Sequence, residues 1–382
     1  MKIQRNKYNQ QMKKKWLNQI DNALKPLFAN ALNNGFFSGA AVGVYLNEKW
    51  GEKRYIKTYG KTRNDIAGEK INKHTLFDLA SLTKPLCTVL SILCLIEQKK
   101  IKRDSPFNNL IRFKIGSEFK KITIEDVLSH SSGLIDYKPY YKDYKAEYNK
   151  EDKKKLIHTL LREPLAYKTG SKCLYSDLGY ILLGEVIENI SGRSLDDFYL
   201  TEIIEYFEIK DELCFRPVRQ FDPYSTNIAA TEHCSWRNKI MQGEVHDEHC
   251  WLVGGVAGHA GLFGSIGGVL SITECILKQW TGKVEYPVYS NELLQSFLTK
   301  QFFNQTWCLG FDTPSESGSS AGKYLSGKSV GHLGFTGTSF WIDPVRELVV
   351  VLLTNRIHPT RKNENIQKFR PLFHDTVIES LN

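Results

Sequence analysis

The chain has 382 residues, of which 41% are hydrophobic and 24% charged, so it can bury one large core or those of two interleaved domains. Its formal net charge is +9, but acidic residues are interleaved with the lysines and no aromatic–basic repeat accompanies them, which argues against a nucleic-acid-binding protein. Eight cysteines without paired spacing suit reduced thiols better than a disulfide framework.

The N-terminus has a basic start but lacks the apolar segment of a secretion signal. No stretch approaches the roughly 20 apolar residues of a membrane span. We therefore expect a cytoplasmic protein with no membrane span; the alternative is an exported protein whose processed signal is missing from the sequence.

Residues 1–32 predict an amphipathic helix, and residues 38–63 predict a hairpin of two β-rich runs around a polar turn with Gly51. The segment "TLFDLASLTKPLCTVLSILCLIEQ", residues 75–98, predicts a buried helix. Pro85 is hard to place deep within a helix, because it lacks an N–H and collides with the preceding turn, so this helix should begin close to Ser81.

From about residue 104 to 250 the pattern is one of helical segments separated by loops. Strand character returns at residues 329–344 and 347–356, and residues 363–382 predict a last helix. This order predicts an α/β (α+β) fold: an antiparallel sheet, built from both termini and flanked by helices, with an inserted all-helical domain. We place the sheet domain at residues 1–103 and 265–382 and the helical insertion at 104–264.

Ser81 and Lys84 are three residues apart, so on a helix they share one face. A serine at a helix N-terminus lies among unpaired N–H groups that favour a nearby oxyanion. A neighbouring amine can supply or accept the proton that activates the hydroxyl as a nucleophile. Taken alone, however, the pair is also explained by Ser81 capping the helix and Lys84 reaching solvent.

Two further motifs accompany this pair. "CLYSDLGYILLG" places Tyr175, Ser176 and Asp177 at a loop-to-helix junction, and "GHLGFTGTSFWIDP" places His332, Leu333 and Gly334 at the head of a strand. With "FDLASLTKP", "TIEDVLSHSSGL" and "GGVAGHAGLFGS" in the same order, the sequence resembles the serine β-lactamase and penicillin-binding protein superfamily, in its class C β-lactamase-like branch of DD-peptidases and esterases.

The resemblance implies an acyl-enzyme mechanism in which Ser81 attacks an acyl carbon. Lys84 would help to activate Ser81, and Tyr175 would be the partner base or would shuttle protons with Lys84; which of the two is the base stays open. His332 matches a position where the family carries Lys or His.

The same resemblance implies that the backbone N–H groups of Ser81 and Phe335 form the oxyanion hole, which stabilises the developing charge. Gly334 would keep the strand edge bare for substrate. The resemblance also implies a sheet domain with a helical insertion and an acyl substrate that is a small molecule or peptide-like. It implies no cofactor and no metal.

Two residues depart from the family's pattern. Asp177 stands where Asn is common, and an ionised carboxylate can only accept hydrogen bonds. Leu333 stands where Thr or Ser is common, which removes a hydroxyl suited to a substrate carboxylate. Both changes favour a neutral ester, or an amide bearing an amine near Asp177, over β-lactams or D-alanyl-D-alanine ends.

Other signals are weaker. His259, in a glycine-rich loop, could contact substrate, although a buried histidine satisfied by backbone groups is the favoured interpretation. The His- and Cys-containing segment 232–250 fits no common zinc spacing. "GLFGSIGG" misses the first glycine of the α/β-hydrolase elbow, so that fold is disfavoured.

The sequence therefore predicts a serine hydrolase acting on an ester or amide, of the esterase or peptidase/amidase type. One alternative is a D-amino-acid-directed carboxypeptidase or a β-lactamase. A second is a non-catalytic sensor or binding protein that is acylated but does not turn over. Neither the natural substrate nor the oligomeric state follows from the sequence.

Overall fold

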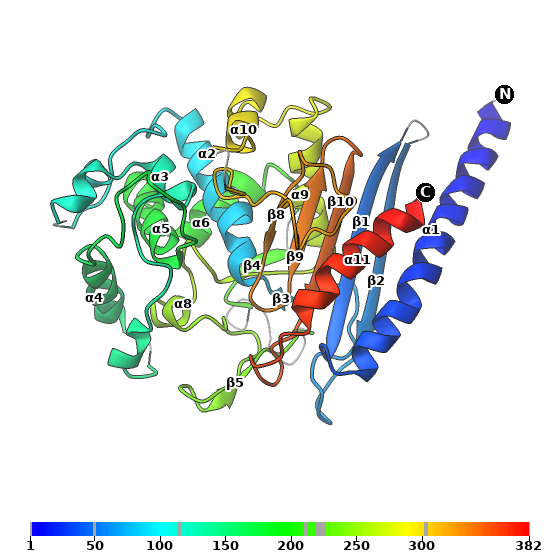
Figure 1. Ribbon diagram of the computed structural model, residues 1–382, viewed down its shortest axis with the longest axis horizontal. Coiled ribbons are helices and arrows are strands. Elements are labelled where there is room, and N and C mark those ends of the chain that lie inside the picture. Colours follow the sequence, from blue (N-terminus) through cyan, green and yellow to red (C-terminus); the bar gives the residue numbers. More distant parts are fainter. Residues whose placement is uncertain are drawn as a thin grey trace.

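The computed structural model describes residues 2–48, 51–113, 116–147, 149–209, 212–217, 227–301 and 305–381. Its centre is a five-stranded antiparallel sheet in the order β2-β1-β10-β9-β8 (Figure 1). The strands are β1 (Gly39–Glu48), β2 (Gly51–Gly60), β8 (Val330–Leu333), β9 (Ser339–Asp343) and β10 (Leu348–Thr354). The predicted hairpin and late strands are confirmed, and the two ends of the chain meet where β1 pairs with β10.

The inner strands of the sheet are buried on both faces, as the alternation along β1 illustrates, whereas the edge strand β2 is partly exposed. Ala40, Val42 and Val44 belong to a core shared with the terminal helices, whereas Ala41 and Tyr45 belong to the core on the other face. Side chains alternate between the faces of a strand, so a strand with apolar residues at every position must be covered on both sides.

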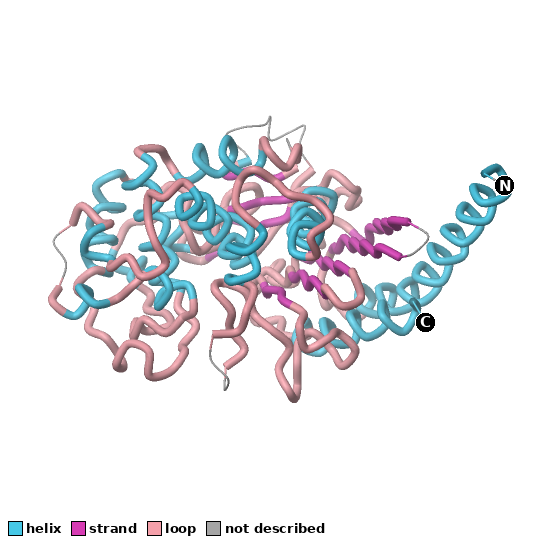
Figure 2. Tube along the Cα trace, turned by 90° about the horizontal axis from the view of Figure 1, so that it is seen from above, coloured by secondary structure: helices cyan, strands magenta, loops and turns pink. Residues whose placement is uncertain are grey.

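The two termini supply the helices on one face. α1 (Lys2–Asn33) and α11 (Ile366–Leu381) pack together there, and the N-terminal part of α1 extends past the rest of the molecule (Figures 1 and 2). The ring of Phe28 meets those of Phe369 and Phe373 at 5.2 and 5.8 Å between centres. On the opposite face, α9 (Ile266–Trp280) packs on β1, β9 and β10.

A second part of the molecule consists mainly of helices and loops (Figure 2). Its helices are α2 (Leu90–Glu97), α3 (Ile124–Leu128), α4 (Lys150–Leu160), α5 (Asp177–Ser191), α6 (Leu195–Tyr199), α8 (Glu248–Leu252) and α10 (Asn291–Phe297). The predicted insertion also contains short strands, namely β4 (Leu213–Phe215), β5 (His233–Cys234), β6 (Lys239–Ile240) and β7 (Leu262–Gly264), and β7 pairs with β3 (Phe77–Asp78). One apolar core runs through the sheet and these helices, so the segment around Ser81 packs on both.

Local signals account for the ends of α5. The Ser176 hydroxyl accepts the Gly179 N–H at 3.4 Å, as an N-cap does, and Gly192 closes the helix with a φ of 74°. The helix therefore begins directly after the Tyr175-Ser176-Asp177 motif.

The helix predicted over residues 75–98 is present, but its first turns are not α-helical. Ala80–Leu82 form a 3₁₀ turn, Lys84–Val89 form π-helical turns, and the α-helix α2 begins only at Leu90. Pro85 lacks an N–H, which is compatible with this altered hydrogen bonding near the start. Such departures within helices are frequent at functional sites.

By length and composition, residues 80–97 are apolar enough to cross a membrane, so the expectation that no stretch approaches this was too strong. Most of the stretch is buried among the other elements of the fold. It is therefore a core helix of this structure.

Candidate active site

Hydrogen bonds from neighbouring elements hold the turn that leads into Ser81. Ala80 has a φ of 48°, in the left-handed region, which costs a non-glycine residue about 1–3 kcal/mol. Its N–H donates to Asp78 Oδ1 at 2.9 Å, and the Thr336 hydroxyl donates to the Asp78 backbone oxygen at 2.7 Å. Thr336 lies between β8 and β9, so these bonds fix Ser81 against the end of the central sheet.

Lys84 joins Ser81 to the second motif. Its ammonium donates to Ser81 Oγ at 3.0 Å, to Asp177 Oδ1 at 2.5 Å and to the His259 backbone oxygen at 3.2 Å. The Lys84 side chain is fully buried, whereas that of Asp177 is 22% exposed. Lys84 does not reach solvent, so the structure excludes the simple surface role that the pair allowed when taken alone.

The environment of Lys84 determines its charge. Burial by itself lowers the pKa of Lys84, because it removes water from the ammonium group. The nearby carboxylate of Asp177 outweighs that effect, so the pKa of Lys84 lies above its usual value of 10.5. Lys84 is therefore charged at neutral pH, and it balances the negative charge of Asp177.

Tyr175 lies over this ion pair and forms part of an aromatic cluster. The Lys84 ammonium is 4.8 Å from the Tyr175 ring centre, and the rings of His130, Trp307 and His332 lie 4.7, 5.3 and 5.9 Å from it. Burial raises the pKa of the Tyr175 hydroxyl, and the positive charge of Lys84 opposes that rise. Burial outweighs the ammonium, so the pKa of Tyr175 lies above its usual value and the hydroxyl holds its proton at neutral pH.

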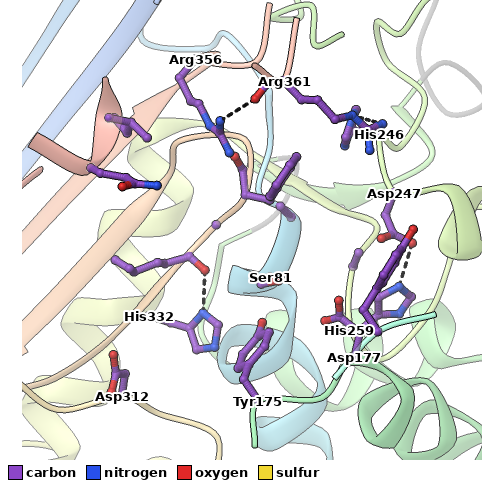
Figure 3. A pocket seen from close by; sticks show the side chains of 18 of the residues that line it. Ser81, Tyr175, Asp177, His246, Asp247, His259, Asp312, His332, Arg356 and Arg361 are labelled. Carbon is purple, nitrogen blue, oxygen red and sulfur yellow. Dashed lines mark hydrogen bonds and ion pairs between the residues drawn. The ribbon is translucent and has the colours of Figure 1, made fainter. Parts of the chain in front are cut away.

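His332 is a buried, neutral histidine. Burial and the charge of Lys84 lower the pKa of His332 to about 3. Nδ1 lies 2.9 Å from the Leu333 backbone oxygen, to which a neutral ring donates, and Nε2 has no hydrogen-bond partner among the described residues. Nε2 is therefore a free acceptor on a residue that lines the site (Figure 3).

Buried neutral histidines predict a specific acid sensitivity. Burial also lowers the pKa of His374, on α11, to about 3. Between pH 6.5 and 3 the unfolded chain binds protons at these positions and the folded chain does not, so stability should fall as pH falls, by up to about 1.4 kcal/mol per pH unit for each histidine. Urea unfolding at pH 7, 6 and 5 should show a smaller slope in His374→Gln than in the wild type. The exposed His74→Gln control should keep the wild-type slope, and an unchanged slope in His374→Gln would contradict the assignment.

Gly334 is also required for packing, in addition to the role at the strand edge that the resemblance implies. A Cβ atom at Gly334 would collide with the Thr338 hydroxyl and the Leu79 backbone oxygen. The next residue, Phe335, has an N–H that makes no hydrogen bond with the described residues, and it lines the same cavity as Ser81. This free N–H fits the expected oxyanion-hole position.

Two buried arginines, which sequence analysis missed, brace this strand end. Arg370 donates to the backbone oxygens of Gly334 and Thr338 at 2.6 and 2.9 Å, and Arg356 Nε donates to the Phe335 oxygen at 2.8 Å. Neither guanidinium forms an ion pair with a carboxylate of the described chain. Burial lowers the pKa of Arg370 to about 9, so it is still charged at neutral pH.

These groups surround a cleft of about 830 Å³ (Figure 3). The predicted residues that line it are Ser81, Tyr175, Asp177, His259, His332, Leu333, Gly334 and Phe335; Lys84 lies buried beneath them. Arg356 and Arg370 line it as well, together with Arg361, which pairs with Glu232 and Glu248 at 2.6 and 2.5 Å. The cleft therefore contains guanidinium groups as well as carboxylates, and no motif in the sequence indicated the guanidinium groups.

The hydrogen-bond partner of the buried His259 ring is not the backbone group that was expected. Its ring Nε2 lies 2.8 Å from Asp247 Oδ1, so a carboxylate, and not a backbone group, is its partner. Asp247 also lines the cleft and was missed as a site residue. Its only sequence signal was membership of the segment considered and rejected for zinc. Across the described residues, no three His, Cys, Asp or Glu side chains are grouped so as to hold a metal ion.

A known protein family matches most of the chain. The family described as Beta-lactamase matches residues 24–370. N-acetylmuramyl-L-alanine amidase of Bacillus subtilis (strain 168) is 31% identical over 335 residues, covering 80% of this chain and 73% of that protein. A protein of Salmonella typhi named "Putative D-alanyl-D-alanine carboxypeptidase" is 29% identical over 345 residues, covering 85% and 78%.

Solved structures share the fold at low sequence identity. EstCE1, described as a hydrolase with promiscuous acyltransferase activity, superposes with a TM-score of 0.73 at 18% identity, covering 94% of this chain and 98% of that one. A class C β-lactamase superposes with a TM-score of 0.71 at 18% identity, covering 96% and 97%. These likenesses establish the predicted fold class.

Proposed function

The chain belongs to the β-lactamase family of serine hydrolases, and we propose that it hydrolyses an amide bond in an acylated amino acid or peptide through an acyl-enzyme on Ser81. The observation that carries this proposal is the contact of the Ser81 hydroxyl with the buried Lys84–Asp177 pair at the base of the cleft. Two relatives over most of the chain are named as an amidase and a carboxypeptidase, which supports an amide over an ester.

In the proposed reaction, Ser81 Oγ bonds to the substrate carbonyl carbon while its proton passes to a base. At neutral pH both Lys84 and Tyr175 hold their protons, because the pKa of each lies above its usual value. We assign the base to Tyr175 after it loses its proton, because the Lys84 ammonium stabilises its ionised form. The N–H groups of Ser81 and Phe335 hold the oxyanion. The carbon–nitrogen bond then breaks, the leaving amine takes the proton from Tyr175, and water hydrolyses the acyl-enzyme by the same steps.

We also propose that the leaving group carries a carboxylate, which revises the preference inferred from Asp177 and Leu333. The charge of Asp177 is balanced by Lys84, so it does not repel an anion as an isolated carboxylate would. Arg356 and Arg370 line the cleft without carboxylate partners among the described residues. A substrate carboxylate would supply the missing counter-charge.

A substrate panel tests the proposal. Purified protein should release alanine from N-acetylmuramyl-L-alanine or from an acyl-D-alanyl-D-alanine peptide in many turnovers, as measured by mass spectrometry. We expect slower turnover of p-nitrophenyl butyrate and of a chromogenic cephalosporin. Turnover of the ester alone would indicate an esterase, preferred turnover of the cephalosporin a β-lactamase, and one stoichiometric burst without turnover a sensor protein.

A further inference from the structure

Asp247 lies on the wall of the cleft, and one of its carboxylate oxygens makes no hydrogen bond with the described residues. It is the N-cap of α8, where Oδ1 accepts the Cys250 N–H at 2.7 Å, and the same Oδ1 accepts from His259 at 2.8 Å. Oδ2 has no hydrogen bond to any described residue. The Asp247 side chain is 23% exposed and lines the cleft, so Oδ2 is accessible to a bound molecule.

Asp247 differs from its neighbours because its partner is a histidine and not a lysine or arginine of the described residues. Asp177 pairs with Lys84, and Glu248 pairs with Arg361. Burial alone would raise the pKa of Asp247, but His259 and the N–H of Cys250 outweigh it and hold the pKa of that carboxyl well below its usual range. Asp247 is therefore ionised, and its remaining partner is a histidine ring.

One nitrogen of the His259 ring also has no hydrogen-bond partner among the described residues. His259 is 1% exposed, and its Nδ1 has no hydrogen-bond partner among the described residues. The ring donates Nε2–H to Asp247 Oδ1, so it orients the carboxylate and leaves Oδ2 without a partner among the described residues.

We propose that Asp247 and His259 form a subsite that binds a protonated amino group of the substrate, a proposal that rests on the proposed hydrolase function. An ammonium group can donate to Asp247 Oδ2 and place a positive charge beside this carboxylate, which has no lysine or arginine partner among the described residues. A hydroxyl could donate to Oδ2 but would supply no charge. The ring of Tyr137, which is 42% exposed and lines the same cleft, offers a further face for a cation.

The test compares substrates that differ only in an amino group. Each pair has one free amine and one neutral copy: D-alanyl against N-acetyl-D-alanyl, and 6-aminohexanoyl against hexanoyl. Each acyl group is prepared both as a p-nitroanilide and as a p-nitrophenyl ester. The measured quantity is the ratio of kcat/KM for the amine substrate to kcat/KM for its neutral copy.

Wild type should favour the amine in at least one pair. Asp247→Asn keeps an oxygen to cap α8 and to accept from His259 but removes the charge, so it should reduce that ratio by about 10- to 100-fold. Turnover of the neutral copies should stay within about twofold of wild type. The control Asp126→Asn removes a carboxylate from the first turn of α3, outside the cleft, and should leave the ratio unchanged.

The proposed subsite would be wrong if the wild type showed no preference for the amine, or if Asp247→Asn left the ratio unchanged. It would also be wrong if Asp247→Asn lowered kcat/KM equally for both members of a pair, because that result indicates a structural role. The wild-type preference can be read even if the variant does not fold. Because the esters report on the subsite independently, a failure to cleave anilides would count against the proposed amidase function alone.

Discussion

Replacement of Ser81 by alanine should reduce hydrolysis of every substrate by about a thousandfold or more, because nucleophile and base act as one unit in serine hydrolases. The Ser81 hydroxyl contacts Lys84 at 3.0 Å, and the turn before it is held by buried hydrogen bonds that alanine does not disturb. The variant should therefore unfold at nearly the wild-type temperature while losing kcat. A fluorophosphonate probe, read by intact mass, should add one label to the wild type and none to Ser81→Ala.

Ser265 offers a matched control. It is the serine of the "GLFGSIGG" segment that was rejected as a nucleophile, and in the structure its hydroxyl caps α9 by accepting the Gly268 N–H. Ser265→Ala should cost about 0.5–2 kcal/mol of stability but keep both labelling and turnover. Labelling that persists in Ser81→Ala and disappears in Ser265→Ala would reverse the assignment of the nucleophile.

Sequence alone was enough for most elements and for the proximity of Ser81 and Lys84, because both depend on local patterns. Alternating and periodic apolar residues predicted the hairpin, the late strands and α5, and a three-residue spacing brought Ser81 and Lys84 to one face. The convergence of Tyr175 and His332 on Ser81 followed only from resemblance to a family. Helical and strand periodicity predict contacts only between residues close in sequence, so they could not predict contacts between residues more than 90 positions apart.

The features that were missed are those created by long-range packing. Lys84 contacts Asp177 and His259 across 93 and 175 residues, and the contact with Asp177 raises the pKa of the buried Lys84. For Gly334 the sequence indicated a bare strand edge, but it could not indicate the close packing of Thr338 and of the Leu79 backbone oxygen against this residue. Arg356 and Arg370 carried no motif, since their role depends on backbone oxygens of another segment.

Asp177→Asn should separate the two possible roles of Lys84. Asp177 raises the pKa of Lys84 above 10.5 against the effect of burial, so removing the carboxylate leaves burial dominant and lowers that pKa. If Lys84 acts as an ammonium, kcat/KM at pH 7 should fall by about 10- to 100-fold and the alkaline limb of its pH profile should move to lower pH. If neutral Lys84 were the base, the variant would instead become more active near neutral pH.

Stability gives an independent measure of the same pair. Removing one partner of a buried ion pair typically costs about 3–5 kcal/mol, and we expect the lower end, about 3 kcal/mol, because the Asp177 side chain keeps 22% of its exposure. Glu188→Gln is the matched control: Glu188 lies on the same helix and pairs with Lys153 at 2.6 Å, but outside the cleft. Its kcat/KM and pH profile should equal those of the wild type. If Asp177→Asn keeps the wild-type stability and the wild-type alkaline limb, Asp177 does not determine the charge of Lys84. The assignment of Tyr175 as the base would then be wrong.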